Sequence, residues 1–207
     1  MDKVINNFFK NHEMTKIYTY SEFMELSESN INNAIVEDLD EQGKIYHEYR
    51  KLNMHRINRI QKVFKPNEQI VSKIKQIKNP QTWLVVTEDW CGDSAQNLPY
   101  FVKYLEYNPK ISLRIILRDQ NLDVIDAYIK DGNPRSIPKI IGFDENGNQL
   151  FIWGPRPKFA QDLVQQLKSE GYSKKEFNEK LHLWYGRNRG KELEIELLKL
   201  FSNLVSE

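Results

Sequence analysis

The sequence is poor in cysteine and has no long apolar run, and each absence excludes a class of protein. A single cysteine, Cys91, stands among 207 residues, so no disulfide can form within the chain. This excludes the disulfide frameworks of small secreted domains. Any redox chemistry at Cys91 would need a second thiol from another molecule. No segment approaches the roughly 18 consecutive apolar residues of a membrane span, so we expect a soluble protein.

Excess charge is also lacking. Thirty basic residues face 29 acidic ones, which gives a net charge of +1. The overall field therefore offers no reason to expect nucleic acid or an acidic membrane as a partner. The first ten residues have neither the apolar region nor the cleavage site of a secretory signal, so a cytoplasmic location is expected. The sequence does not indicate an oligomeric state.

Glycine and proline are almost absent from the first 80 residues, which read as a helical N-terminal extension. Thr19 and Glu22 have the spacing of a capping box, which predicts a short helix through Leu26. A long helix is predicted over 37–64, and a third helix over 68–77. The apolar residues that we expect on the packed face of the long helix are Ile45, Tyr49, Leu52, Ile57 and Ile60.

The pattern changes between residues 81 and 170, where apolar strands alternate with amphipathic helices. Strands are predicted over 83–87, 111–117, 137–143 and 149–153, and helices over 94–107, 122–130 and 158–168. Asp119 or Asn121 could cap the second of these helices. Asn146-Gly147 suits a tight hairpin between the last two strands. The order β-α-β-α-β-β-α predicts an α/β domain with a central mixed sheet.

From residue 171 the chain reads as a second helical extension, over 171–207. Ser173 and Glu176 form another capping box, which opens a helix carrying Phe177, Leu181 and Trp184, and a last helix is predicted over 191–204. No flexible linker separates the three parts. We therefore expect the extensions to pack on the α/β core as one compact body.

The most informative segment lies between the first strand and the helix that follows it. Cys91 is predicted at the N-terminus of that helix, where free backbone N–H groups and the helix dipole favour a thiolate. A thiolate is the nucleophile of disulfide exchange. Glu88, Asp89 and Asp93 oppose this effect, because negative charges disfavour an ionised sulfur. The sequence leaves the balance open.

Trp90-Cys91-Gly92-Asp93-Ser94 resembles the Trp-Cys-Gly-Pro-Cys active site of thioredoxins. Pro99 falls where that family has a proline in its active-site helix, and Ile137-Pro138 resembles its cis-proline motif. Gly154 occupies the place of another family glycine. The resemblance covers about residues 81–170 and implies a thioredoxin-like fold. The Cys-Gly-Asp-Ser variant is similar to a branch of single-cysteine bacterial thioredoxin-like proteins.

The sequence departs from the family at two positions that serve the second half of its reaction. Ser94 replaces the second cysteine, and a hydroxyl cannot form a disulfide. Val85 stands where the family has a buried acidic residue that helps move a proton. A mixed disulfide on Cys91 could therefore be released only by an external thiol. The loss of both parts suggests that a dithiol cycle has been abandoned.

The resemblance implies roles for the residues around Cys91, and each has an alternative. Cys91 is expected to be an exposed, reactive thiol instead of an inert buried one, and Trp90 to shape a partner-binding surface or merely cover the core. Asp93 is expected to cap the helix. Ser94 could donate a hydrogen bond to the thiolate or only complete the first turn. Gly92, Ile137 and Pro138 complete the site that we expect.

These observations favour a thiol-disulfide oxidoreductase or thioltransferase that uses Cys91 and an external thiol. Its partner would be a protein or low-molecular-weight disulfide or thiol. The alternatives are a thioredoxin-like module that binds a protein without turnover, and a redox sensor with a reversibly capped Cys91. The four histidines are scattered, with no paired spacing. No metal site and no cofactor are therefore expected.

Overall fold

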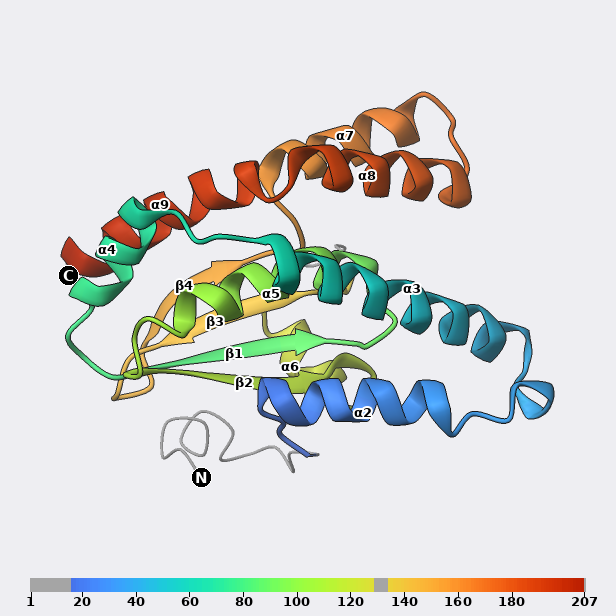
Figure 1. Ribbon diagram of the computed structural model, residues 1–207, viewed down its shortest axis with the longest axis horizontal. Coiled ribbons are helices and arrows are strands. Elements are labelled where there is room, and N and C mark those ends of the chain that lie inside the picture. The colour runs from blue at the N-terminus through green and yellow to red at the C-terminus, as the bar shows by residue number, and fades with distance from the viewer. Residues whose placement is uncertain (1–15, 129–133, 207) are drawn as a thin grey trace.

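The computed structural model describes residues 16–128 and 134–206, which build one four-stranded sheet covered by helices (Figure 1). The strands are β1 (Gln81–Thr87), β2 (Ile111–Leu117), β3 (Lys139–Phe143) and β4 (Gln149–Trp153), in the spatial order β2-β1-β3-β4. β1 pairs parallel with β2, whereas the β1–β3 and β3–β4 pairs are antiparallel. The predicted mixed sheet is thereby confirmed.

The central strand β1 is buried on both faces along all seven residues. Alternate side chains of a strand point to opposite faces, so β1 contributes to two separate cores. Trp83 and Val85 join the larger core with Phe101 and Phe201, while Leu84 joins the smaller one. The sulfur-bearing Cys91 belongs to this smaller core. The site therefore rests on a rigid strand that has no solvent-facing side.

Three helices belong to the α/β unit: α5 (Gly92–Leu105), α6 (Leu122–Asp126) and α7 (Lys158–Ser169). Asn121 occupies the N-cap position of α6, but its side chain makes no capping hydrogen bond, contrary to the prediction; its amide instead donates to the carbonyl of Leu117. The end predicted for this helix, residues 129–130, lies outside the described residues. Pro99 lies inside α5.

The N-terminal region forms α2 (Tyr20–Asn32), a short 3-10 turn over Val36–Asp38, α3 (Glu41–Val63) and α4 (Glu68–Gln76). The capping box of Thr19 and Glu22 is present, but α2 continues beyond the predicted end at Leu26. Figure 1 shows α2 beside the open edge of β2 and α3 over the start of α5. The helices α2 and α3 therefore meet the sheet at the end where Cys91 lies.

The C-terminal region forms α8 (Lys174–Asn188) and α9 (Lys191–Ser206). The capping box of Ser173 and Glu176 opens α8 as predicted. Arg189 and Gly190 both have positive φ angles and form the turn between α8 and α9. In Figure 1, α8 lies against α7 while α9 returns to pack on α4. Within the described residues, no helix has both the length and the apolar character to cross a bilayer.

The packed face of α3 differs from the prediction. Ile57 and Ile60 are buried, but Ile45, Tyr49 and Leu52 are 46%, 37% and 48% exposed. The inward face instead includes the polar side chains of His47 and Asn53. The middle of α3 lies over a polar loop instead of an apolar surface, and Arg50 and Asn53 hydrogen-bond to Asp89 of that loop. Apolar spacing alone could not reveal this.

Candidate functional site

Cys91 lies directly before the first turn of α5, at the end of the loop that follows β1. Its backbone N–H donates to the carbonyl of Glu88 at 3.1 Å, which holds the loop in a turn. Its Sγ donates to the carbonyl oxygen of Ile137 at 3.3 Å. The Ile137–Pro138 peptide bond is cis, as the sequence motif suggested. The thiol and the proline loop, which are far apart in the sequence, therefore meet directly.

Gly154 completes this contact from the far side of the proline loop. Its φ angle is +114°, a conformation that favours glycine. A Cβ at this position would also overlap the carbonyl oxygen of Pro138. The glycine thus lets the chain after β4 pass against the proline loop, and any larger residue would push the loop away from Cys91.

The expectation that Cys91 is exposed is wrong for this structure. Cys91 is only 7% exposed, and burial raises the pKa of its thiol to about 11, with the nearby Asp93 carboxylate adding to the rise. The Ser94 side chain and the first N–H groups of α5 lower the pKa, as the helix-terminus argument predicts. Their effect is smaller than that of burial, because the sulfur has lost nearly all contact with water. The resting thiol is therefore protonated at neutral pH.

Ser94 occupies the position of the second cysteine, but its partners lie in the protein core. Its hydroxyl shares a hydrogen bond with the hydroxyl of Thr87 on β1, and it also faces Cys91. Val85, in place of the family's acidic residue, is fully buried among apolar side chains. The chain thus supplies a hydrogen bond beside Cys91 and no second thiol.

Both faces of the Trp90 ring are covered. The ring stacks on Tyr46 of α3, with centroids 4.3 Å apart and planes 4° from parallel. The guanidinium of Arg118 lies 5.0 Å from the ring centroid. Trp90 is therefore used mainly to fix α3 against the loop, and only its edge remains to contact a partner. The sequence did not suggest this, because Tyr46 belongs to the helical extension.

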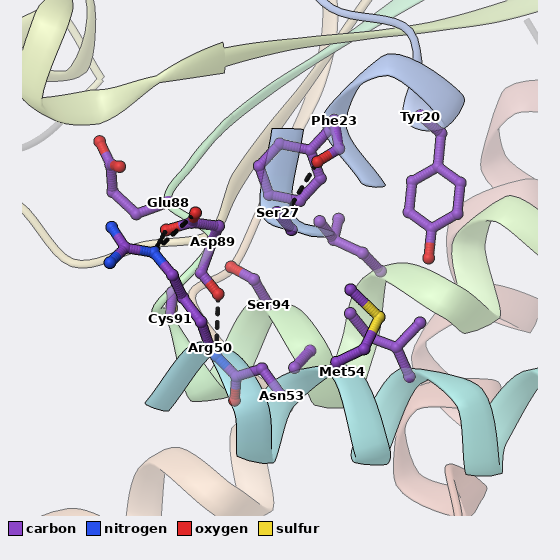
Figure 2. Close-up of a pocket in the computed structure, with 13 residues that line it drawn as sticks. Tyr20, Phe23, Ser27, Arg50, Asn53, Met54, Glu88, Asp89, Cys91 and Ser94 are labelled. Atoms are coloured by element: carbon purple, nitrogen blue, oxygen red, sulfur yellow. Dashed lines mark hydrogen bonds and ion pairs between the residues drawn. The ribbon is translucent and has the colours of Figure 1, made fainter. Parts of the chain in front are cut away.

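Asp89 anchors the same loop to the N-terminal helices. Arg50 Nε lies 2.8 Å from each Asp89 carboxylate oxygen, and Asn30 Nδ2 donates to Oδ2 at 2.7 Å. Asn53 Nδ2 donates to the Asp89 carbonyl at 3.0 Å, so both the side chain and the backbone are held (Figure 2). The Asp89 side chain is only 3% exposed. These contacts clamp α2 and α3 over the loop that carries Cys91.

A small cavity of about 10 Å³ remains between the clamped helices and the loop. Figure 2 shows side chains from α2, α3 and α5 around it, and Cys91 is one of its lining residues. Most of the deeper lining is apolar, including Phe23, Met54 and Ile57. The cavity has room for about one water molecule, so the helices close over this side of Cys91.

Asp93 does not cap α5, contrary to the prediction. The capping position is Cys91, whose side chain makes no cap hydrogen bond. Asp93 instead accepts from Arg156 Nη2 at 2.6 Å and from Nε at 3.1 Å, and from the Tyr185 hydroxyl at 2.7 Å. Asn97 donates to the same tyrosine oxygen at 3.1 Å. This buried network joins the start of α5 to α8, and local sequence gave no sign of either Arg156 or Tyr185.

Glu88 is a further carboxyl group near Cys91, and the sequence did not mark it as unusual. It is 7% exposed, and Oε1 accepts from the Asp119 backbone N–H at 2.8 Å. Burial raises the pKa of Glu88 to about 7, and the neighbouring carboxylates of Asp119 and Asp89 contribute. The negative charge that we assigned to Glu88 is therefore only partly present at neutral pH. Within residues 16–128 and 134–206, no three His, Cys, Asp or Glu residues gather as a metal site.

Comparisons with known proteins agree with this geometry. A family profile described as thioredoxin matches residues 40–168, which include α3 and α4 as well as the sheet. A crystal structure of a protein of unknown function from Pseudomonas aeruginosa is similar, with a TM-score of 0.52 and 16% identity. The match covers 91% of this chain and 96% of that one.

A second similar structure is that of an HIV epitope scaffold, with a TM-score of 0.51 and 18% identity. The match covers 89% of this chain and 98% of the scaffold. At these identities the two structures support the fold alone. No curated protein matches the sequence.

Proposed function

Because the chain belongs to the thioredoxin family, we propose that it carries out thiol-disulfide exchange through Cys91 and an external thiol. The observation that supports this most directly is the 3.3 Å contact between Cys91 Sγ and the Ile137 carbonyl, beside the cis bond to Pro138. The sulfur at the start of α5 thus lies against the loop that the family uses to hold the substrate strand.

The exchange has two steps. The Cys91 thiolate attacks one sulfur of a disulfide R–S–S–R′, which forms Cys91–S–S–R and releases R′–S⁻, and the latter takes up a proton. An external thiol R″–SH then loses its proton and attacks the R sulfur. This forms R–S–S–R″ and returns Cys91 as the leaving thiolate. Ser94 takes no part as a nucleophile, because an alcohol cannot accept the disulfide.

The buried thiol sets the rate that we expect. A pKa of about 11 leaves about one molecule in ten thousand as thiolate at pH 7, against a few per cent for an unperturbed cysteine. The reaction of the folded protein should therefore be slower than that of free cysteine at pH 7. It should rise about tenfold per pH unit up to about pH 11, because the thiolate fraction rises in that proportion.

The test is intact-mass spectrometry after incubation with bis(2-hydroxyethyl) disulfide, which is small and uncharged. We expect one adduct on the wild-type protein, its removal by an added thiol, and no adduct on Cys91→Ser. Ser94→Ala serves as the control, since it keeps the thiol and removes only its hydrogen-bond donor. A folded protein that gains no adduct even at pH 10 would falsify the proposal, provided the urea-unfolded protein reacts.

A second function is favoured by the burial of Cys91 and by its raised pKa: a binding module that recognises a protein without turnover. In that case the Cys91 thiol is a structural donor that fixes the proline loop. Partner binding would then be unchanged in Cys91→Ser and unaffected by dithiothreitol. Binding that dithiothreitol abolishes would favour exchange over the module.

A further inference from the structure

Two arginines of α3 extend toward α8 beside the start of α5. Arg59 Nη1 lies 3.9 Å from the position that a Cβ would take at Gly186 of α8. Arg56 Nη1 lies 3.4 Å from the corresponding position at Gly92, and the His182 ring packs so closely there that a Cβ would overlap it. The group formed by Arg56, Arg59 and Arg156, called the arginine cluster below, therefore begins at the residue next to Cys91.

Positive charge in the arginine cluster is not balanced. Arg156 has Asp93 as its ion-pair partner, at 2.6 Å. Arg56 donates only to the amide oxygen of Asn53, at 2.8 Å. Across the described part of the chain, neither Arg56 nor Arg59 forms an ion pair. Three guanidinium groups thus share one carboxylate.

The positive charge of the cluster affects the pKa values of nearby groups. Burial lowers the pKa of Arg56 and the neighbouring Arg59 lowers it further, while Asp93, which is already paired with Arg156, opposes this effect. Burial also lowers the pKa of His182 to about 3, with Arg56 and Arg156 adding to the effect, so His182 is neutral. A half-buried guanidinium without an anion is unfavourable unless a ligand supplies the missing charge. Carboxylates suit this role, because the guanidinium fork binds them through two parallel hydrogen bonds.

The cluster lies within reach of the sulfur. Arg56 Nη1 lies 3.4 Å from the position of a Cβ at Gly92, which follows Cys91, and Arg156 binds Asp93, two residues after Cys91. A ligand with carboxylates on the cluster would therefore have its other end near Cys91. A compact thiol that carries carboxylates would place negative charge on the arginines and its sulfur near Cys91.

We infer that Arg56, Arg59 and Arg156 bind the carboxylates of a low-molecular-weight thiol, the external thiol that releases Cys91. Its sulfur attacks the R sulfur of Cys91–S–S–R, a new disulfide forms between thiol and R, and Cys91 recovers the proton that the thiol loses. The statement that this thiol releases Cys91 rests on the proposed exchange. The binding of its carboxylates does not, because the cluster needs no reaction to hold an anion.

The test uses S-methylglutathione, which has two carboxylates and a blocked sulfur, in calorimetric titrations of the full chain. We expect saturable binding that weakens about tenfold in Arg56→Gln and in the more exposed Arg59→Gln, since each loses a charged hydrogen bond. Lys44→Gln is the matched control, because it removes one positive charge from α3 about 18 Å from Arg56. Thermal melting checks that each variant is folded.

The dimethyl ester of the same probe has nearly the same shape but lacks the two carboxylate charges, so comparing the two affinities isolates the contribution of charge. Equal affinity for probe and ester, no binding of either, or equal binding by wild type and both arginine variants would each overturn the inference. The exchange assay with the uncharged disulfide is independent of this result. An inert Cys91 with intact S-methylglutathione binding would refute the proposed function and leave the anion site standing.

Discussion

Arg50 and Arg56 project from the same helix, fewer than two turns apart, and their surroundings are opposite. Arg50 meets the buried Asp89 carboxylate at 2.8 Å and clamps α3 to the loop before Cys91. Arg56 faces the residue after Cys91 and has only a neutral amide oxygen as a partner. On one side of the site the arginine is paired with a carboxylate, whereas on the other Arg56 forms no ion pair with any described residue.

The comparison separates structural charges from charges available for a ligand. A buried pair such as Arg50 and Asp89 stabilises the fold mainly because removal of one partner leaves the other uncompensated. An arginine without an ion-pair partner contributes little to the stability of the fold and can bind an anion from outside. The next four substitutions test this division by their effects on the free energy of unfolding.

Arg50→Gln should have the largest effect, a loss of about 3 kcal/mol, because Asp89 would keep a buried charge with no cation beside it. Urea denaturation measures this free energy directly. Lys51→Gln on the same helix is the control, since its partner Glu48 is exposed and its midpoint should not move. A small loss in Arg50→Gln would mean that the loop is held by Asn30 and Asn53 instead.

Glu88→Gln should have the next largest effect, and one that depends on pH. The folded pKa of Glu88, about 7, lies above its unfolded value, so its stabilising contribution is complete below about pH 4.5 and is lost as pH rises through 7. The wild type should therefore lose roughly 2 kcal/mol relative to Glu88→Gln between pH 4.5 and 8. Parallel curves for the two proteins across this range would contradict the raised pKa.

Tyr185→Phe should lower the free energy of unfolding by about 1.5 kcal/mol. The substitution keeps the ring but removes the donor to Asp93 and the acceptor for Asn97. Thermal denaturation measures the effect, and Tyr172→Phe, on the exposed turn before α8, provides the control. An unchanged stability would show that Arg156 alone satisfies Asp93.

Arg56→Gln should have the smallest effect, a change within about 0.5 kcal/mol, because no ion pair is lost. This outcome, combined with weaker S-methylglutathione binding, would place Arg56 among the ligand-binding residues. A loss as large as that of Arg50→Gln would remove the difference between the two sides and show that Arg56 stabilises the fold.

Local pattern was sufficient for much of this protein. Capping boxes at Thr19 and Ser173 and the apolar run of β1 predicted the elements that form, since these signals act over a few residues. The same holds for the meeting of Cys91 with Pro138, which followed from a family motif. The packed face of α3 was predicted incorrectly, because apolar spacing assumes an apolar surface beneath a helix.

The sequence by itself determined the order of the elements, the absence of a second thiol, and the place of Cys91 at the start of a helix. Tertiary structure alone decided that this sulfur is buried, that Trp90 is covered on both faces and that Asp93 pairs with Arg156. It also decided that Arg56 forms no ion pair among the described residues. Burial and charge pairing depend on groups brought together from distant parts of the chain, and no local pattern records those distances.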